Sequence, residues 1–183
     1  ATIMIPNGGP LNALRACGGL AFWPLEQRLA VQAASVKWRD AAQDPEVWAD
    51  LDVPASLLDT LPGILAKRGS TVRRLRITVW PSEKRLAGFL TGLARCDRLE
   101  QLSLQGLSGG VEQLAGGAGA LLRLPSVHVL KLSYMPYFIL SAYSHHTGVL
   151  SATVLLDWVV RAFPNLAHLM CDYLQIDNAG LQL

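Results

Sequence analysis

The sequence predicts an α/β fold with parallel strands inside and helices outside, preceded by a small helical module. Three observations support this prediction. Large apolar residues recur at relative positions 1, 4, 6 and 9 in four segments, stretches of helical periodicity separate the segments, and the residues before them follow a helical pattern alone. We expect the helical module at residues 1–46 and the repeated strands and helices at residues 47–183.

Composition excludes several classes of protein. Of 183 residues, 51% are apolar and 16% charged, which suffices for a buried core. The net charge of +2 is too small for a protein held mainly by phosphates, so nucleic acid is not an expected partner. Residues 132–156 carry no charge, but Pro136, Gly148 and the pair His145–His146 interrupt them, so no membrane span is expected.

The three cysteines, Cys17, Cys96 and Cys171, are far apart and odd in number. They predict neither a disulfide framework nor a thiolate zinc site, and we expect a reducing compartment, the cytoplasm or the nucleus. No metal site or cofactor is expected, because His145 and His146 lack a third ligand at a typical spacing.

The helical module is predicted mainly from residues 25–43, which have the apolar spacing of a helix. Residues 44–48, D-P-E-V-W, predict a turn after it. The start of the module suits a helix less well, because Gly18 and Gly19 each cost a helix interior about 0.5–1 kcal/mol relative to Ala.

This module resembles the F-box, whose second half has an Arg-Leu-Ala helix, a Trp-Arg pair, an acidic-Pro turn and a Trp. The matching residues are Arg28, Leu29, Ala33, Ala34, Trp38, Arg39, Asp44, Pro45 and Trp48. The resemblance implies docking on a Skp-type linker protein and, through it, on a cullin. The residues that it assigns to this contact are Leu11, Leu14, Leu20, Trp23, Pro24, Leu25, Leu29 and Trp38.

The repeated segments predict one short strand each, because alternate strand residues share a face. A fainter copy precedes them at Trp48, Leu51 and Val53, and the middle apolar residues of the five copies are 24, 27, 28 and 39 residues apart. The long last interval predicts an insertion at residues 134–148. The apolar positions are Val72, Leu75, Ile77, Trp80; Leu99, Leu102, Leu104, Leu107; Val127, Leu130, Leu132, Met135; and Leu166, Leu169, Cys171, Leu174.

Between the strands, apolar residues recur at intervals of 3 and 4, which predicts a helix in each gap. Turns are expected after these helices at Gly69, Cys96, Pro125 and Pro164. The apolar helix residues are Leu86, Phe89, Leu90 and Leu93; Leu114, Ala118, Leu121 and Leu122; and Leu155, Val159, Val160 and Phe163.

A strand and a returning helix within 27 or 28 residues resemble the leucine-rich-repeat family, from Trp48 to Leu183. The resemblance implies a solenoid of about five strands. The chain departs from the family at position 9, often Asn or Cys, which is here Trp80, Leu107, Met135 and Leu174. No polar capping unit follows Asp177, so we expect the array to continue in a longer protein.

An F-box followed by leucine-rich repeats implies a non-enzymatic adaptor, the substrate receptor of a Skp-cullin-F-box ubiquitin ligase. The repeat surface would hold the protein to be ubiquitinated. The strand residues that alternate with the buried ones should form this concave face: Arg74, Arg76, Gln101, Ser103, Lys131, His168 and Met170. The basic side chains among them indicate an acidic or phosphorylated ligand.

Two other functions stay open. The repeats also suit a structural scaffold fixed in a large assembly. Residues 106–110 satisfy G-x-S-x-G after a predicted strand, and Asp157 and His168 follow, so a serine hydrolase using Ser108 is the third possibility. Against the hydrolase, no histidine precedes His128, so an H-G-G-G-type oxyanion loop is missing, and Leu107 keeps the repeat register.

Overall fold

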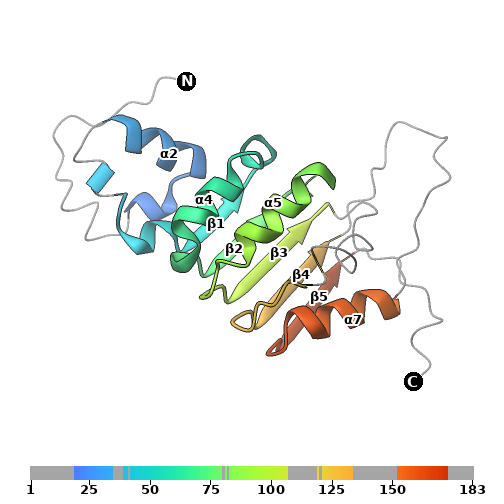
Figure 1. Cartoon of the computed structure of the whole chain (residues 1–183). Coiled ribbons are helices and arrows are strands. Elements are labelled where there is room, and N and C mark those ends of the chain that lie inside the picture. The colour runs from blue at the N-terminus through green and yellow to red at the C-terminus, as the bar shows by residue number, and fades with distance from the viewer. Residues whose placement is uncertain are drawn as a thin grey trace. The chain divides into compact units, whose positions relative to one another are not determined.

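The computed structural model describes residues 19–34, 39–40, 42–79, 81, 83–106, 119, 121–133 and 152–172. The chain divides into two compact units, Ala1–Asp50 and Leu51–Leu183, whose elements Figure 1 shows. The sequence places the boundary a few residues earlier, between residues 46 and 47.

The smaller unit contains the 3-10 helix η1 (Gly19–Phe22), the helix α2 (Leu25–Ala34) and the 3-10 helix η2 (Pro45–Trp48). Helix α2 begins at the predicted residue. The predicted acidic-Pro turn is the start of η2, where the Asp44 Oδ1 atom accepts a hydrogen bond from the backbone N–H of Glu46 at 3.0 Å. Pro45 suits the first helical position, because that N–H would have no partner within the helix.

The larger unit is a mixed α/β structure built on a parallel five-stranded sheet. Its strands are β1 (Asp50–Val53), β2 (Arg74–Ile77), β3 (Gln101–Gln105), β4 (Val129–Ser133) and β5 (His168–Asp172), and their order in the sheet is their order in the chain. The leucines that mark the repeat stand side by side, since Leu75 pairs with Leu102, Leu102 with Leu130 and Leu130 with Leu169. The sequence predicts this fold class and the strand positions correctly.

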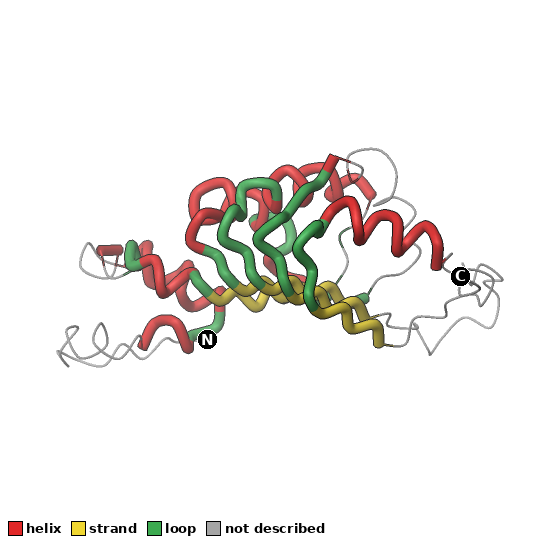
Figure 2. The backbone as a smooth tube through the Cα atoms, turned by 90° about the horizontal axis from the view of Figure 1, so that it is seen from below, coloured by secondary structure: helices red, strands yellow, loops and turns green. Residues whose placement is uncertain are grey.

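Three helices cover one face of this sheet, as Figure 2 shows: α4 (Leu61–Arg68), α5 (Glu83–Leu93) and α7 (Ala152–Ala162). No described helix of this unit covers the opposite face. The core lies between the helices and the sheet, where Leu75, Leu102 and Leu130 are fully buried and Phe89 and Trp158 pack from the helix side. Alternation along the strands therefore separates an apolar face from a polar one.

One turn recurs before four of the strands. The backbone N–H groups of Val72, Leu99, Val127 and Leu166 each donate to the carbonyl three residues earlier, at 3.1–3.2 Å. The predicted turn residues Gly69 and Cys96 supply two of these carbonyls, while Pro125 and Pro164 lie inside the other two turns. The same hydrogen bond thus ends the returning segment in successive repeats.

Several predicted helix positions are wrong. Val160 is 69% exposed, and Trp158 takes the buried place on α7 instead, because intervals of 3 and 4 from Leu155 reach residues 158 and 159 equally well. Leu121 is exposed, whereas Leu122 is buried. Helix α4 ends at the predicted turn residue Gly69, although the sequence pattern names no apolar residues for it.

The apolar residues of the last strand are less buried than their counterparts on the preceding strands. Leu169 is 37% exposed and Cys171 is exposed, whereas the equivalent residues of β2, β3 and β4 are fully buried. The difference follows from the place of β5 at one edge of the described sheet. The position-9 residues (Trp80, Leu107, Met135 and Leu174), the insertion at residues 134–148 and Leu114 with Ala118 lie outside the described residues.

Candidate functional site

The uncovered face of the sheet carries all seven residues that the sequence predicts for a concave binding surface. One row across the strands contains Arg76, Ser103, Lys131 and Met170, and the adjacent row contains Arg74, Gln101 and His168. We call these seven residues, together with Asp52 of β1 and Asp172 of β5, the open face. On β1, β2 and β4 the residues of this face alternate with buried apolar residues, so the strand backbone fixes the direction of their side chains.

Charge on the open face is basic toward the middle and acidic at the sides. Arg74, Arg76 and Lys131 come from β2 and β4, while Asp52 and Asp172 come from the two outer strands. The Arg76 Nη1 atom lies 3.7 Å from the Asp52 Oδ2 atom, and both side chains are more than half exposed. Such a pair contributes about 0–1 kcal/mol, so a ligand carboxylate can replace Asp52 at little cost.

Ser103 does not belong to the accessible surface. Its side chain is only 7% exposed, although its position in the row is the predicted one. In register it lies between Arg76 and Lys131, whose long side chains rise on either side of a short one. Ser103 therefore forms the floor of the open face, and its neighbours supply the contacts.

Met170 adds an apolar area at one end of the open face, since 43% of its surface is exposed. Asp52, at the other end, is a residue that the sequence analysis does not assign to the site. The alternation of Leu51, Asp52 and Val53 contains the signal, because two buried residues flank an exposed one.

In the smaller unit, the buried Arg28 forms the centre of a hydrogen-bond network. Its guanidinium donates to the carbonyls of Trp23 (2.6 Å), Val47 (2.6 Å), Asp50 (2.8 Å) and Ala21 (2.5 Å). Burial lowers the pKa of Arg28, and the negative charge of Asp50 opposes this effect. The network joins η1, α2 and η2, so Arg28 has a structural role in this unit.

Trp48 supports the same unit from the other side of η2. Its ring is buried, and its Nε1–H donates to the carbonyl of Ala42 at 2.6 Å. The predicted turn and its tryptophan thus form part of the packing of this unit.

The residues expected to contact a Skp-type partner lie in different environments. Leu20 and Leu25 are buried in the unit, Trp23 and Leu29 are half-buried, and Pro24 is exposed. Because a buried side chain is used for packing already, Leu20 and Leu25 are not part of an exposed docking face. Leu11, Leu14 and Trp38 lie outside the described residues.

Phe22 is an exposed apolar residue that the sequence analysis overlooks. It is 85% exposed, although it is adjacent to the expected contact residue Trp23. An aromatic side chain exposed to water is typical of a contact for an apolar partner. The signal available in the sequence was the run L-A-F-W at residues 20–23. Consecutive side chains of a helix point in different directions, so these four cannot all face one core.

Of the three residues expected for a serine hydrolase, the structure describes Asp157 and His168. Ser108 lies outside the described residues, and the Asp157 Oδ2 atom accepts from Arg161 Nη2 at 2.6 Å. His168 lies on the open face of the sheet. Gly106 has a φ of 72°, a conformation that favours glycine, so it serves the turn at the end of β3.

Metal binding and membrane insertion can be assessed for the part of the chain that the structure describes. There, no three His, Cys, Asp or Glu side chains are grouped as a metal site would require. No helix of that part has the length and apolar character to cross a membrane. Comparison with protein-family models and with curated proteins finds no match for this chain.

Proposed function

We propose that the protein is a non-enzymatic adaptor, the substrate receptor of a Skp-cullin-F-box ubiquitin ligase, and that the open face binds its target protein. One observation carries the proposal: seven polar or exposed residues from four strands, at matching positions of the repeat, share one uncovered sheet face. A rigid row of side chains separated by one strand spacing suits recognition of an extended protein surface.

The fold supports a leucine-rich-repeat solenoid as the framework of this surface. Strand order follows chain order, the marker leucines pair directly, and four turns share one hydrogen bond. In the part of the chain that the structure describes, the helices lie on a single face of the parallel sheet and none of them covers the other face. In such a solenoid the concave side is the surface that each repeat extends, which supports the target-binding role.

The smaller unit is proposed to dock the Skp-type linker. Its F-box-like residues Arg28 and Trp48 hold the unit together, which leaves Phe22, Pro24 and Leu29 as accessible apolar contacts. A cullin would join through the linker, in the cytoplasm or the nucleus, and catalysis would belong to these partners.

The target-binding role is tested by affinity purification of the full-length protein from its own cells, with mass spectrometry of bound proteins. The double variant Arg76→Glu/Lys131→Glu should lose the target and keep the Skp-type linker. The variant Arg85→Glu/Arg161→Glu has the same charge change on α5 and α7, across the sheet, and should keep both. Retention of every bound protein by the first variant would contradict the proposal.

The same purification separates a ligase adaptor from a scaffold. An adaptor brings down a Skp-type linker and a cullin, and Phe22→Asp/Leu29→Asp removes both. Recovery of structural partners alone, unchanged by this variant, would favour the scaffold. The buried Leu25 is unsuitable for this test, because a charge at that position would unfold the unit.

A further inference from the structure

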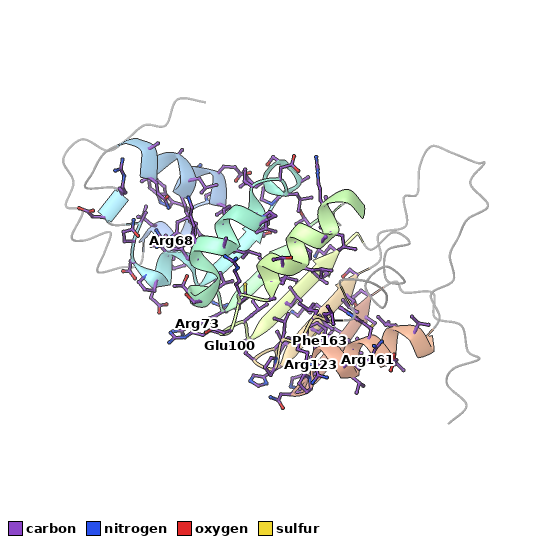
Figure 3. The ribbon with its side chains drawn as sticks, viewed as in Figure 1. Arg68, Arg73, Glu100, Arg123, Arg161 and Phe163 are labelled. Carbon is purple, nitrogen blue, oxygen red and sulfur yellow. The ribbon has the colours of Figure 1, made fainter. Side chains whose placement is uncertain are left out.

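Basic side chains gather along the edge of the larger unit where the strands begin. Arg68, Arg95 and Arg123 each come one residue before the recurring turn, so they occupy the same place in three successive repeats. Arg98 lies within the second of these turns. We call Arg68, Arg95, Arg98 and Arg123 the basic edge. Figure 3 labels Arg68 from the first of these repeats and Arg123 from the third, together with Glu100 from the second.

Backbone contacts hold these turns next to one another. A Cβ atom on Gly69 would lie 3.0 Å from the carbonyl oxygen of Arg95, so the first two turns are in direct contact. The carbonyl of Glu100 accepts from the N–H groups of His128 (2.9 Å) and Val129 (3.1 Å), which joins the second repeat to the third. The first turn therefore contacts the second, and the strand that follows the second turn is joined to the strand that follows the third.

The charges of this edge are unbalanced. Arg95, Arg98 and Arg123 are exposed, and none forms an ion pair with a described residue. The neighbouring acidic residues are Asp97 and Glu100. A positive charge is favourable at the C-terminal end of a helix dipole, which explains Arg68 in the last turn of α4. The dipole does not explain the positive charges of Arg98 and Arg123, which lie outside the helices. Exposed like charges on neighbouring turns favour an anionic partner.

We propose that the basic edge binds a segment of acidic side chains on a partner protein. Guanidinium groups pair with carboxylates in bidentate hydrogen bonds, so the acidic residues of one extended segment can pair with arginines from successive turns. A single-stranded nucleic acid would need stacking surfaces, yet the described aromatic residues of this unit, Phe89, Trp158 and Phe163, are buried. The basic edge is separate from the open face, so it does not depend on the proposed function.

The test is fluorescence anisotropy of a labelled oligoglutamate peptide with the full chain at low ionic strength. The unchanged protein should bind this peptide, and Arg95→Gln/Arg123→Gln should weaken binding about tenfold or more. Arg85→Gln/Arg161→Gln removes the same charge from α5 and α7, where the two arginines are paired with Asp59 and Asp157, and should change affinity by less than about twofold. Circular dichroism of each variant verifies that it is folded.

A charge reversal sharpens the test. Arg95→Glu/Arg123→Glu should lose oligoglutamate and acquire binding of oligolysine at low ionic strength. Three outcomes would overturn the proposal: no binding of oligoglutamate by the unchanged protein, equal losses in the two Gln double variants, or tighter binding of an oligothymidylate of the same length. The last outcome would assign the edge to nucleic acid.

Discussion

Arg28 is the residue on which the smaller unit depends most. It supplies hydrogen bonds to four carbonyls that belong to different segments of the chain. We expect Arg28→Ala to lower the free energy of unfolding by about 3 kcal/mol, because it leaves buried carbonyls without donors. Urea unfolding, with amide hydrogen exchange of residues 19–50, measures the change.

Arg39 provides the control for this prediction. Its Nε–H donates to the carbonyl of Gln32 at 3.4 Å, and the contact is exposed to solvent. Arg39→Ala should therefore change stability by less than about 0.5 kcal/mol. Equal losses for Arg28→Ala and Arg39→Ala would show that the network contributes little.

Cys96 and Cys171 should differ in reactivity. Burial, and next the charge of Asp97, raise the pKa of Cys96 from 9.0 to about 12, so its thiol stays protonated in the native protein. The pKa of Cys171 is also raised, by partial burial and by Asp172, but its side chain is exposed. Iodoacetamide below pH 9 should label Cys171 ahead of Cys96, as peptide mass spectrometry can verify.

The raised pKa of Cys96 also sets a direction for stability. Above pH 9.0, the unfolded chain loses a proton that the folded protein keeps, so the free energy of unfolding should decrease as the pH rises from 9.0 toward 12. Cys96→Ala should flatten this part of the pH profile. An unchanged slope, or labelling of Cys96 ahead of Cys171, would contradict its buried position.

At the scale of the elements, the marker leucines allow a matched comparison. Leu102 and Leu130 are fully buried, whereas Leu169 pairs with Leu130 in the same register but is partly exposed. Leu102→Ala or Leu130→Ala should cost about 2–5 kcal/mol, and Leu169→Ala less than about 1 kcal/mol. Chemical denaturation of the three variants tests this order, and equal costs would contradict the observed core.

Two glycines of the α4 region should respond in opposite directions. A side chain on Gly69 would meet the backbone of Arg95, which cannot move without shifting the adjacent turn, so Gly69→Ala should cost about 1–3 kcal/mol. Gly63 lies within α4 with nothing near its missing Cβ, and Gly63→Ala should stabilise by about 0.5–1 kcal/mol. Thermal unfolding measures both, and a stabilising Gly69→Ala would contradict the close contact between the turns.

Strand positions were predictable from the sequence because the spacing of Leu75, Leu102 and Leu130 fixes both the strand and its buried face. Helix α4 was not, because Pro62 and Gly63 resemble a turn, yet Pro is accommodated in the first turn of a helix. Nor does the sequence distinguish Val160 from Trp158, since either continues the helical period.

At the scale of the whole molecule, the sequence places the polar residues of the open face correctly but not their accessibility. Ser103 is covered because it is short, which depends on the length of its neighbours across strands. Leu25 is buried and Phe22 exposed for a similar reason, since their environment depends on how η1 and α2 pack around Arg28. The period of a strand or helix predicts the face to which a side chain points, whereas the depth of its burial depends on residues distant in the chain.

The most direct measurement of the adaptor role is calorimetric titration of the full chain with a purified Skp-type linker protein. We expect a one-to-one complex with a dissociation constant of about 1 μM or lower, weakened about tenfold or more by Phe22→Asp/Leu29→Asp. The folded variant Arg76→Glu/Lys131→Glu should bind the linker as the unchanged protein does. Absence of binding, or equal weakening by both double variants, would contradict the account.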